Sequence, residues 1–407
     1  MKINGAVLYD PANKIESVLT DIFISNKTVS ASPGEGETIE ADGLIAMPGG
    51  IDIHTHLSST RARSAGFSAK EIADLYLSLG YTHIVEAGVA YSDLDKYIEL
   101  TMNLPIGCSI LELVGNETGG ENSEKYLAKK YVGERGVEMF LASNADEKSS
   151  PTSHIHLPRL ALPGSFDVLK DFIEKLAGRR CHIAHIAYYI FGENGKGEHL
   201  PKVKEAAELL AKNKNVTFDL GPPTFGRSLA YTADTELAER VARSSGNIAD
   251  SASLWSAVEY EFIQERYIDS LFWLTAVSLI LEIEDLSRAS LSIDFPSGGS
   301  IEGYPFTIAS LMSVDVRNRF AKMLNHQAIA ASSLITNERE LGLNEIAQLT
   351  RSSPASACGF TNRGHLGVNA YVDMVLYRRD KDLEKMFRYP AYVIRGGEVV
   401  VRNGKVV

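Results

Sequence analysis

Histidines are concentrated in short apolar runs of this chain. Six of its ten histidines lie in three such runs: Ile53-His54-Thr55-His56, His154-Ile155-His156 and Cys181-His182-Ile183-Ala184-His185. A fourth apolar run, Leu291-Ser292-Ile293-Asp294, ends in an aspartate. Imidazole nitrogens and carboxylate oxygens are the ligands that a zinc-like divalent cation takes from proteins. The four runs therefore predict a metal site, provided that the fold brings their ends together.

His54 and His56 are two residues apart, so both point to the same face of one strand. One such pair is equally compatible with a half-buried strand that binds no metal. His156 and His185 strengthen the metal interpretation, because each ends an apolar run of its own. His154 shares the parity of His156 one rung deeper, and we expect it to support the site or pack in the core. His182 lies three residues before His185, should point the other way on a regular strand, and is predicted to be structural.

Asp294 closes its strand just before the glycine-containing loop Phe295-Pro296-Ser297-Gly298-Gly299. We expect it to contact both a metal-bound water and the substrate; the alternative is that it caps the following helix. Neutral imidazoles leave a cation electrophilic, so its bound water ionises near neutral pH. A carboxylate beside that water takes the proton and later passes it to a leaving amine. This chemistry is that of amide hydrolysis, with Asp294 as catalytic residue and metal ligand.

Other residues are candidates for substrate contacts. Arg159 follows the His156 run and suits an anionic part of a substrate, although a surface salt bridge fits it equally. The backbone amides of Gly298 and Gly299 have room to approach a ligand. Asp219 is a candidate for supporting a metal ligand from behind. Glu86, and Asn116 beyond the next strand, are expected to be loop or packing residues.

The middle of the chain alternates strand and helix patterns. Amphipathic helices are predicted at 69–78, 166–176 and 200–212, and 270–281 is expected to be a buried helix too short to span a membrane. The predicted strands are 50–56, 82–88, 108–115, 136–143, 153–157, 181–187, 216–221 and 289–295. This α/β order predicts a (β/α)8 TIM-like barrel over residues 49–355, with the site at the carboxyl ends of the strands. A doubly wound open sheet is the alternative.

Both ends of the chain read as short strands and tight turns. Residues 1–48 and 356–407 are therefore predicted to form one small β-sandwich domain beside the barrel. The net charge of −11 argues against a nucleic-acid partner. Three dispersed cysteines form no disulfide pattern, and the N-terminus lacks the apolar region of a signal peptide. We expect a cytoplasmic protein with no membrane partner.

Several runs together resemble a known family over nearly the whole chain. They are Met47-Pro48-Gly49-Gly50-Ile51-Asp52-Ile53-His54-Thr55-His56, Leu79-Gly80-Tyr81-Thr82-His83-Ile84-Val85-Glu86-Ala87, His154-Ile155-His156, Ile293-Asp294-Phe295-Pro296-Ser297-Gly298-Gly299, Glu345-Ile346-Ala347-Gln348-Leu349-Thr350-Arg351 and Gly364-His365-Leu366-Gly367-Val368. They resemble the A-type subunits of formylmethanofuran dehydrogenase, a family of the amidohydrolase superfamily that includes the matching component of the bacterial formyltransferase/hydrolase complex. The first run fits any amidohydrolase; the later ones carry the specific resemblance.

The resemblance implies a zinc-dependent enzyme of one-carbon metabolism and methanogenesis. Its reaction would be the reversible hydrolysis of an N-formyl amine, formylmethanofuran, to formate and methanofuran. By position, the family's metal ligands fall on His54, His56, His156 and His185, and its catalytic acid on Asp294. In the archaeal enzyme of this family the subunit works beside a molybdenum- or tungsten-containing partner that reduces CO2 to formate, so the resemblance implies partner subunits.

The chain departs from the family at the fourth strand, where a carboxylated lysine bridges two metals. The segment Gly136-Val137-Glu138-Met139-Phe140-Leu141-Ala142-Ser143 has no lysine, and Phe140 stands at the matching position. Of one or two zinc ions, one is therefore favoured. Two other functions stay open: a degenerate, non-catalytic family member with an assembly role, and an amidohydrolase that acts on another amide or a cyclic amide.

Overall fold

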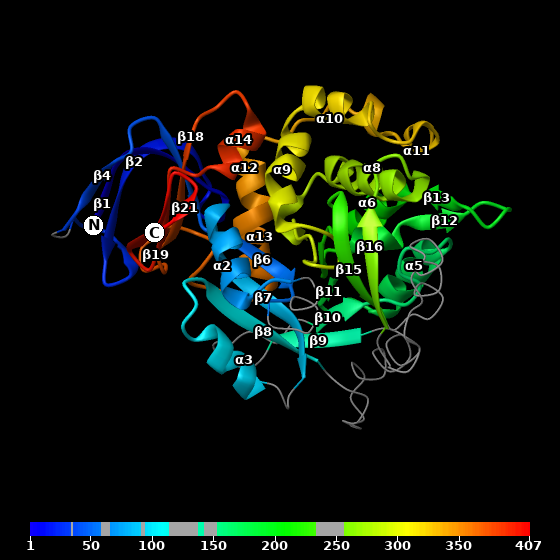
Figure 1. Cartoon of the computed structure of the whole chain (residues 1–407), viewed down its shortest axis with the longest axis horizontal. Helices are drawn as coiled ribbons and strands as arrows, with labels where there is room; N and C mark the ends of the chain where they lie inside the picture. The colour runs from blue at the N-terminus through cyan, green and yellow to red at the C-terminus, as the bar shows by residue number, and fades with distance from the viewer. Residues whose placement is uncertain (34–35, 58–65, 91–93, 114–136, 142–152, 233–255) are drawn as a thin grey trace.

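The computed structural model describes residues 1–33, 36–57, 66–90, 94–113, 137–141, 153–232 and 256–407. Two large sheets organise them, one in the middle of the chain and one made from its two ends (Figure 1). Two antiparallel strand pairs accompany the sheets, β12 (Phe191–Glu193) with β13 (His199–Pro201) and β15 (Gly226–Thr232) with β16 (Ser256–Phe262).

The central sheet contains all eight strands predicted for the barrel. Its strands, in spatial order, are β17 (Ala289–Ser290), β14 (Val216–Asp219), β11 (Cys181–Ile183), β10 (Ser153–His156), β9 (Val137–Leu141), β8 (Gly107–Leu113), β7 (Tyr81–Ala90) and β6 (Gly50–Thr55). This order follows the chain, as a sequential α/β architecture requires, and the predicted doubly wound alternative is not observed.

One strand departs from the predicted all-parallel arrangement. β9 pairs antiparallel with both β8 and β10, whereas the other neighbours in the sheet are parallel. A parallel crossover takes a dozen or more residues, and the connection between β9 and β10 (residues 142–152) is shorter than that.

The two end strands of the series approach each other through the segment that follows β17. Thr55 forms an isolated parallel bridge with Phe295, and the His56 amide donates to the Phe295 carbonyl at 2.9 Å. The ends of the sheet thus meet where the candidate ligands lie. A fully closed (β/α)8 barrel remains a prediction.

The helices of the described residues are α2 (Ala69–Ser78), α3 (Leu94–Thr101), α5 (Ser165–Lys175), α6 (Val203–Lys212), α8 (Tyr267–Glu282), α9 (Tyr304–Met312), α10 (Val314–Ala321), α11 (His326–Ala330), α12 (Leu343–Ala347), α13 (Ser353–Ala357) and α14 (Leu383–Arg388). α2 has the predicted bounds and begins with a capping box between Ser68 and Glu71. α8 is apolar around its circumference and is buried along nearly its whole length, as predicted for 270–281.

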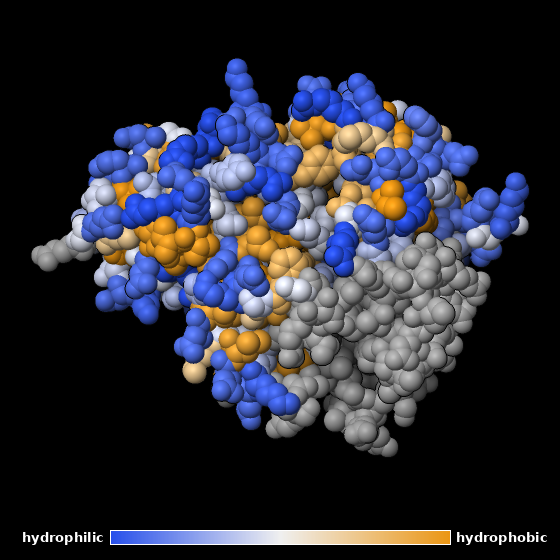
Figure 2. All heavy atoms as spheres, viewed as in Figure 1, coloured by the Kyte–Doolittle hydropathy of each residue, from blue (hydrophilic) through white to orange (hydrophobic). Residues whose placement is uncertain are grey.

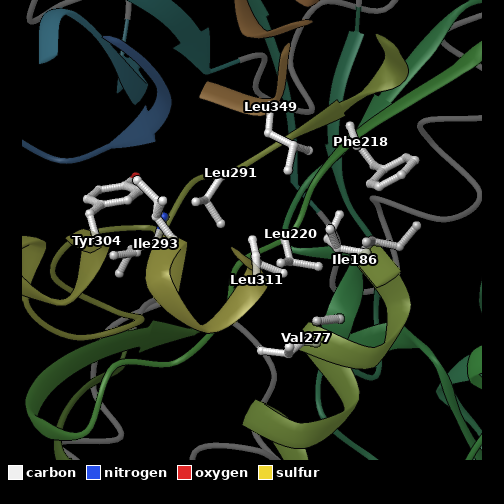
Figure 3. Close-up of a cluster of buried hydrophobic side chains, with 14 of the residues drawn as sticks. Ile186, Phe218, Leu220, Val277, Leu291, Ile293, Tyr304, Leu311 and Leu349 are labelled. Carbon is white, nitrogen blue, oxygen red and sulfur yellow. The ribbon is translucent and has the colours of Figure 1, made fainter. Parts of the chain in front are cut away.

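Short helical turns complete the connections. They are η1 (Pro11–Asn13), η3 (Ile186–Tyr189), η4 (Leu286–Arg288), η5 (Ile301–Gly303), η6 (Leu334–Thr336) and the π-helical η7 (Gln348–Ser352). α8 and α9 pack against the segments that continue from β14 and β17. Figure 3 shows this core, in which Leu220, Val277, Leu291 and Leu311 interdigitate.

The second sheet joins the two ends of the chain. Its nine strands are β1 (Lys2–Asp10), β2 (Ile15–Ser25), β3 (Thr28–Ser30), β4 (Thr38–Glu40), β5 (Leu44–Pro48), β18 (Asp373–Arg378), β19 (Tyr392–Arg395), β20 (Glu398–Arg402) and β21 (Lys405–Val406). β18 pairs with β5, so the two ends form one connected sheet; the predicted β-sandwich and the boundaries at 48/49 and 355/356 stay predictions.

Alternation along β5 and β18 links this sheet to the rest of the molecule. Ile45 and Met47 belong to the core that includes the central sheet, whereas Ala46 belongs to a separate core within the terminal sheet. Successive side chains of a strand point to opposite faces, so one face of the sheet packs on the α/β part.

Hydrophilic residues predominate over much of the face shown in Figure 2. Within the described ranges, no helix has both the length and the apolarity needed to cross a membrane. The three cysteines are free, as their spacing predicted.

Candidate metal centre

β6 positions the first two candidate ligands. His54 and His56 are buried on the strand face that also carries Asp52, whereas Ile51 and Ile53 pack on the other side in a small apolar cluster. The strand is buried along its length, which explains why its apolar residues alternate with polar ones that must find partners inside the protein.

Asp294 meets these two imidazoles from the segment after β17. Its Oδ1 lies 3.1 Å from His56 Nε2 and 3.3 Å from His54 Nε2. The residue has a left-handed backbone with φ of 57°, and its carbonyl accepts the Gly298 amide at 2.9 Å. The turn aims the carboxylate back at β6, so the predicted helix-capping alternative does not describe its contacts.

His156 and His185 join the group from β10 and from the residue next to η3. His185 Nε2 lies 2.9 Å from His156 Nδ1, and the His54 ring centre lies 4.9 Å from that of His156 and 5.4 Å from that of His185. The structure thus brings together all four predicted imidazoles and the predicted carboxylate. Their roles as ligands remain a proposal.

Asp219, at the end of β14, ties the ligands together from the deeper side. Its Oδ2 lies 3.3 Å from His54 Nδ1 and 3.3 Å from His182 Nε2, and its Oδ1 accepts the His185 amide at 2.7 Å. A carboxylate on Nδ1 fixes the tautomer of His54 and leaves Nε2 directed at the site. This is the supporting contact expected of Asp219.

The prediction that His182 points away from the site is wrong. Its ring stacks on that of His154 at 4.8 Å and reaches Asp219. The parity argument fails because β11 ends at Ile183 and His185 has a left-handed φ of 33°, so strand alternation does not extend to His185. His154, one rung below His156, lies in this deeper layer as expected.

The donor set fits a divalent cation. Three overlapping groups have their ligand atoms within 4.8 Å of one another, and His54 belongs to all three: with His156 and His185, with His56 and Asp294, and with His154 and Asp219. Several of their buried ring nitrogens have no hydrogen-bond partner: His154 Nε2, His156 Nε2 and His185 Nδ1. Buried polar atoms in native proteins rarely lack partners, and a nitrogen-rich set with one carboxylate is typical of zinc.

The electrostatics favour cation binding. Burial lowers the pKa of His185 to about 4 and holds that of His156 well below its ordinary value, so both are neutral near pH 7. Burial also lowers the pKa of His54, but the carboxylates of Asp294 and Asp219 outweigh it and raise the value to about 9. Burial raises the pKa of Asp294, but the imidazoles of His54, His56 and His185 together outweigh burial and lower the pKa below its ordinary value, so Asp294 is ionised.

The predicted substrate contacts are already engaged within the protein. Arg159 donates to the Pro163 carbonyl at 2.9 Å, in its own loop. The Gly298 amide donates to Asp294, and a Cβ at Gly298 would lie 1.8 Å from the Ile293 carbonyl oxygen. The loop's packing therefore requires this glycine. A substrate contact by Arg159, Gly298 or Gly299 stays a prediction.

Of the remaining predicted residues, Glu86 is buried and accepts the Leu57 amide at 2.5 Å, which agrees with a packing role. Asn116 and the side chains of Glu138 and Phe140 lie outside the part of the structure that is described.

Sequence reasoning missed one group of buried residues beside the ligands. Asp52 is fully buried and hydrogen-bonded to side chains from α2, from α9 and from the segment before Asp294. The sequence held one signal for Asp52: it is two residues before His54 and four before His56, so all three side chains share one face of β6.

Comparison with known proteins agrees with this architecture. No family model matches the chain. FhcA, from the formyltransferase/hydrolase complex Fhc of Methylorubrum extorquens, is 27% identical over 490 aligned residues, covering 100% of this chain and 89% of the relative. Protein FwdA of Methanocaldococcus jannaschii is 25% identical over 502 residues, covering 100% and 88%. The crystal structure of the Methylorubrum extorquens FhcABCD complex with methylofuran matches with a TM-score of 0.87 at 24% identity, over 100% of this chain and 89% of that one.

In sequence and fold the chain is thus similar, over its whole length, to a subunit of a formyltransferase/hydrolase complex and to FwdA. More specifically, the resemblance to the A-type subunits of formylmethanofuran dehydrogenase is confirmed along the whole chain, in their bacterial and their archaeal form.

Proposed function

We propose that this chain is a zinc-dependent hydrolase that cleaves, and in reverse forms, the amide of an N-formyl amine. The observation that carries the proposal is the convergence of His54 Nε2 and His56 Nε2 on Asp294 Oδ1 in a buried site. The similarity to FhcA of a formyltransferase/hydrolase complex, and to a structure containing methylofuran, supports a methanofuran-like amine as the product.

His54, His56 and Asp294 would hold the ion, with His156 and His185 completing the set. We propose one ion, because the three possible groups all require His54. When bound, zinc supplies a Lewis acid for the formyl oxygen and lowers the pKa of a coordinated water. Asp294, an ionised carboxylate in contact with both imidazoles, accepts the proton of the attacking water and delivers it to the leaving amine.

Asp219 and Arg159 are proposed to support the metal centre and the substrate, respectively. Asp219 orients His54, so that the ring presents Nε2 to the site. Arg159 is proposed to hold an anionic part of the substrate, because a guanidinium group suits carboxylates. We also propose that the chain works with other subunits, as its relative in the FhcABCD complex does.

The experiment is formate release from formylmethanofuran by zinc-loaded protein. We expect turnover that a chelator abolishes and added Zn²⁺ restores. A protein that neither binds zinc tightly nor releases formate would overturn the proposal.

Two other functions are distinguishable in the same assay. The absence of lysine from residues 136–143 favours a non-catalytic assembly role, in which the chain would bind partner subunits and release no formate. A hydrolase of another amide would bind zinc, leave formylmethanofuran intact and cleave a cyclic amide such as dihydroorotate.

A further inference from the structure

Asp52 gathers hydrogen bonds from four separate segments around the metal centre. Its Oδ2 accepts the Tyr76 hydroxyl of α2 at 2.7 Å and the Tyr304 hydroxyl of α9. Its Oδ1 accepts the His54 amide at 3.0 Å and the Ser292 hydroxyl. All four side chains, Asp52, Tyr76, Ser292 and Tyr304, are fully buried.

The contacts of Asp52 are directional. None of the ion pairs among the described residues includes Asp52, so its partners are hydroxyl and amide groups in fixed orientations. Burial raises the pKa of its carboxyl, and these hydrogen bonds oppose that shift. Such a network specifies geometry, because each partner occupies one position around the carboxyl group.

Two of these contacts lie directly before Asp294. Ser292 bonds to Asp52 and also lies 2.9 Å from the His54 carbonyl oxygen. The Tyr304 hydroxyl accepts the Ile293 amide at 3.1 Å while donating to Asp52, and Figure 3 shows Tyr304 beside Ile293. The two residues preceding Asp294 are thus both fastened to the Asp52 network.

The backbone conformation of Asp294 depends on these contacts with its neighbours. Its φ of 57° is unfavourable for a residue with a side chain, and such conformations persist where the surroundings impose them. The strand pairing of β17 ends at Ser290, four residues earlier. Backbone hydrogen bonds of Leu291 and Ser292 to neighbouring segments continue beyond it. The side-chain contacts of Ser292 and Tyr304 add to them and tie the segment to Asp52 on β6.

We propose that Asp52 is a positioning residue that fixes the distance between Asp294 and the imidazoles of His54 and His56, acting through Ser292 and Tyr304. The inference deepens the proposed function, on which it rests. Breaking the network should loosen the cation site and misplace the Asp294 carboxylate.

The test compares Ser292→Ala with Ser310→Ala. Ser310 is also fully buried, and its hydroxyl donates to the Phe306 carbonyl on α9 at 2.8 Å without touching Asp52. Each variant is measured for Zn²⁺ affinity of the metal-free protein by competition with a chromophoric chelator. Thermal unfolding is recorded alongside, as are kcat and KM at saturating zinc.

For Ser292→Ala we expect Zn²⁺ to bind about 10- to 100-fold more weakly, the range for residues that orient metal ligands. Its kcat should fall with KM unchanged, and Ser310→Ala should match the wild type in all three values. Equal Zn²⁺ affinities for the two serine variants would overturn the inference. Should Ser292→Ala fail to fold, Tyr304→Phe removes the second fastening and is judged by the same comparison. The zinc measurement needs no substrate, so it judges the inference even where formylmethanofuran is not turned over.

Discussion

Asp294→Asn is the sharpest perturbation of the proposed chemistry. Asparagine keeps the size of the side chain and one oxygen toward His54 and His56, but it cannot take up a proton. General acid–base catalysis by a positioned side chain contributes about 10²- to 10⁴-fold. This factor corresponds to roughly 3–5 kcal/mol of transition-state free energy. Because the carboxylate contacts two imidazoles at 3.1 and 3.3 Å in a buried site, we expect a loss of kcat in this range.

The assay is formate release with zinc content measured on the same samples. KM should change little, since the lost interaction belongs to the proton transfer. The pKa of the Asp294 carboxyl lies below its ordinary value of 3.8, so it stays in the base form as the pH falls to about 5. The wild-type rate should therefore lose its Asp294-dependent part only at still lower pH. Asp315→Asn, at an exposed carboxyl of α10, is the control. A zinc-loaded Asp294→Asn protein with wild-type kcat would refute the reasoning.

Three further predictions follow from individual contacts. Asp219→Asn should weaken Zn²⁺ binding about 10- to 100-fold in chelator competition, because His54 loses the carboxylate that orients it; an unchanged affinity would contradict this. Saturation with zinc at about 100 times its Kd should stabilise the protein by about 2.7 kcal/mol, seen as a higher Tm in calorimetry, whereas a Tm insensitive to chelation would count against the site. Burial, partly opposed by Arg363, raises the pKa of Asp373 from 3.8 to about 6. The folded state then holds this proton more tightly than the unfolded one, so the free energy of unfolding should fall by roughly 3 kcal/mol as pH rises from about 4 to 6. In urea titrations, the Asp373→Asn variant should lack that part of the fall in the free energy of unfolding. If the pH profiles of the variant and the wild type were parallel, Asp373 would not be the source of the fall.

The elements that carry the site were predictable because their signals are local. α2 spans Ala69–Ser78 as its apolar spacing indicates, with Ile72, Ala73, Tyr76 and Leu77 buried on one face. The eight strand segments follow from short apolar runs bounded by turns. The ends of those runs then placed His54, His56 and Asp294 near one another, because consecutive strands of an α/β sheet present their carboxyl ends at a common edge.

The features that the sequence could not reveal depend on distant contacts. β11 ends at Ile183 and the chain turns at His185, which reverses the expected direction of His182. The antiparallel β9 is set by its pairing on both sides. Asp52 meets Ser292 and Tyr304 across 240 and 252 residues of sequence, so no local pattern contains that network.

The most direct measurement is an anomalous difference map at the zinc absorption edge from crystals of the zinc-loaded chain. We predict one peak within bonding distance of His54 Nε2, His56 Nε2 and an Asp294 carboxylate oxygen. The account would be contradicted by zinc that binds elsewhere on the protein while these three side chains have no density between them.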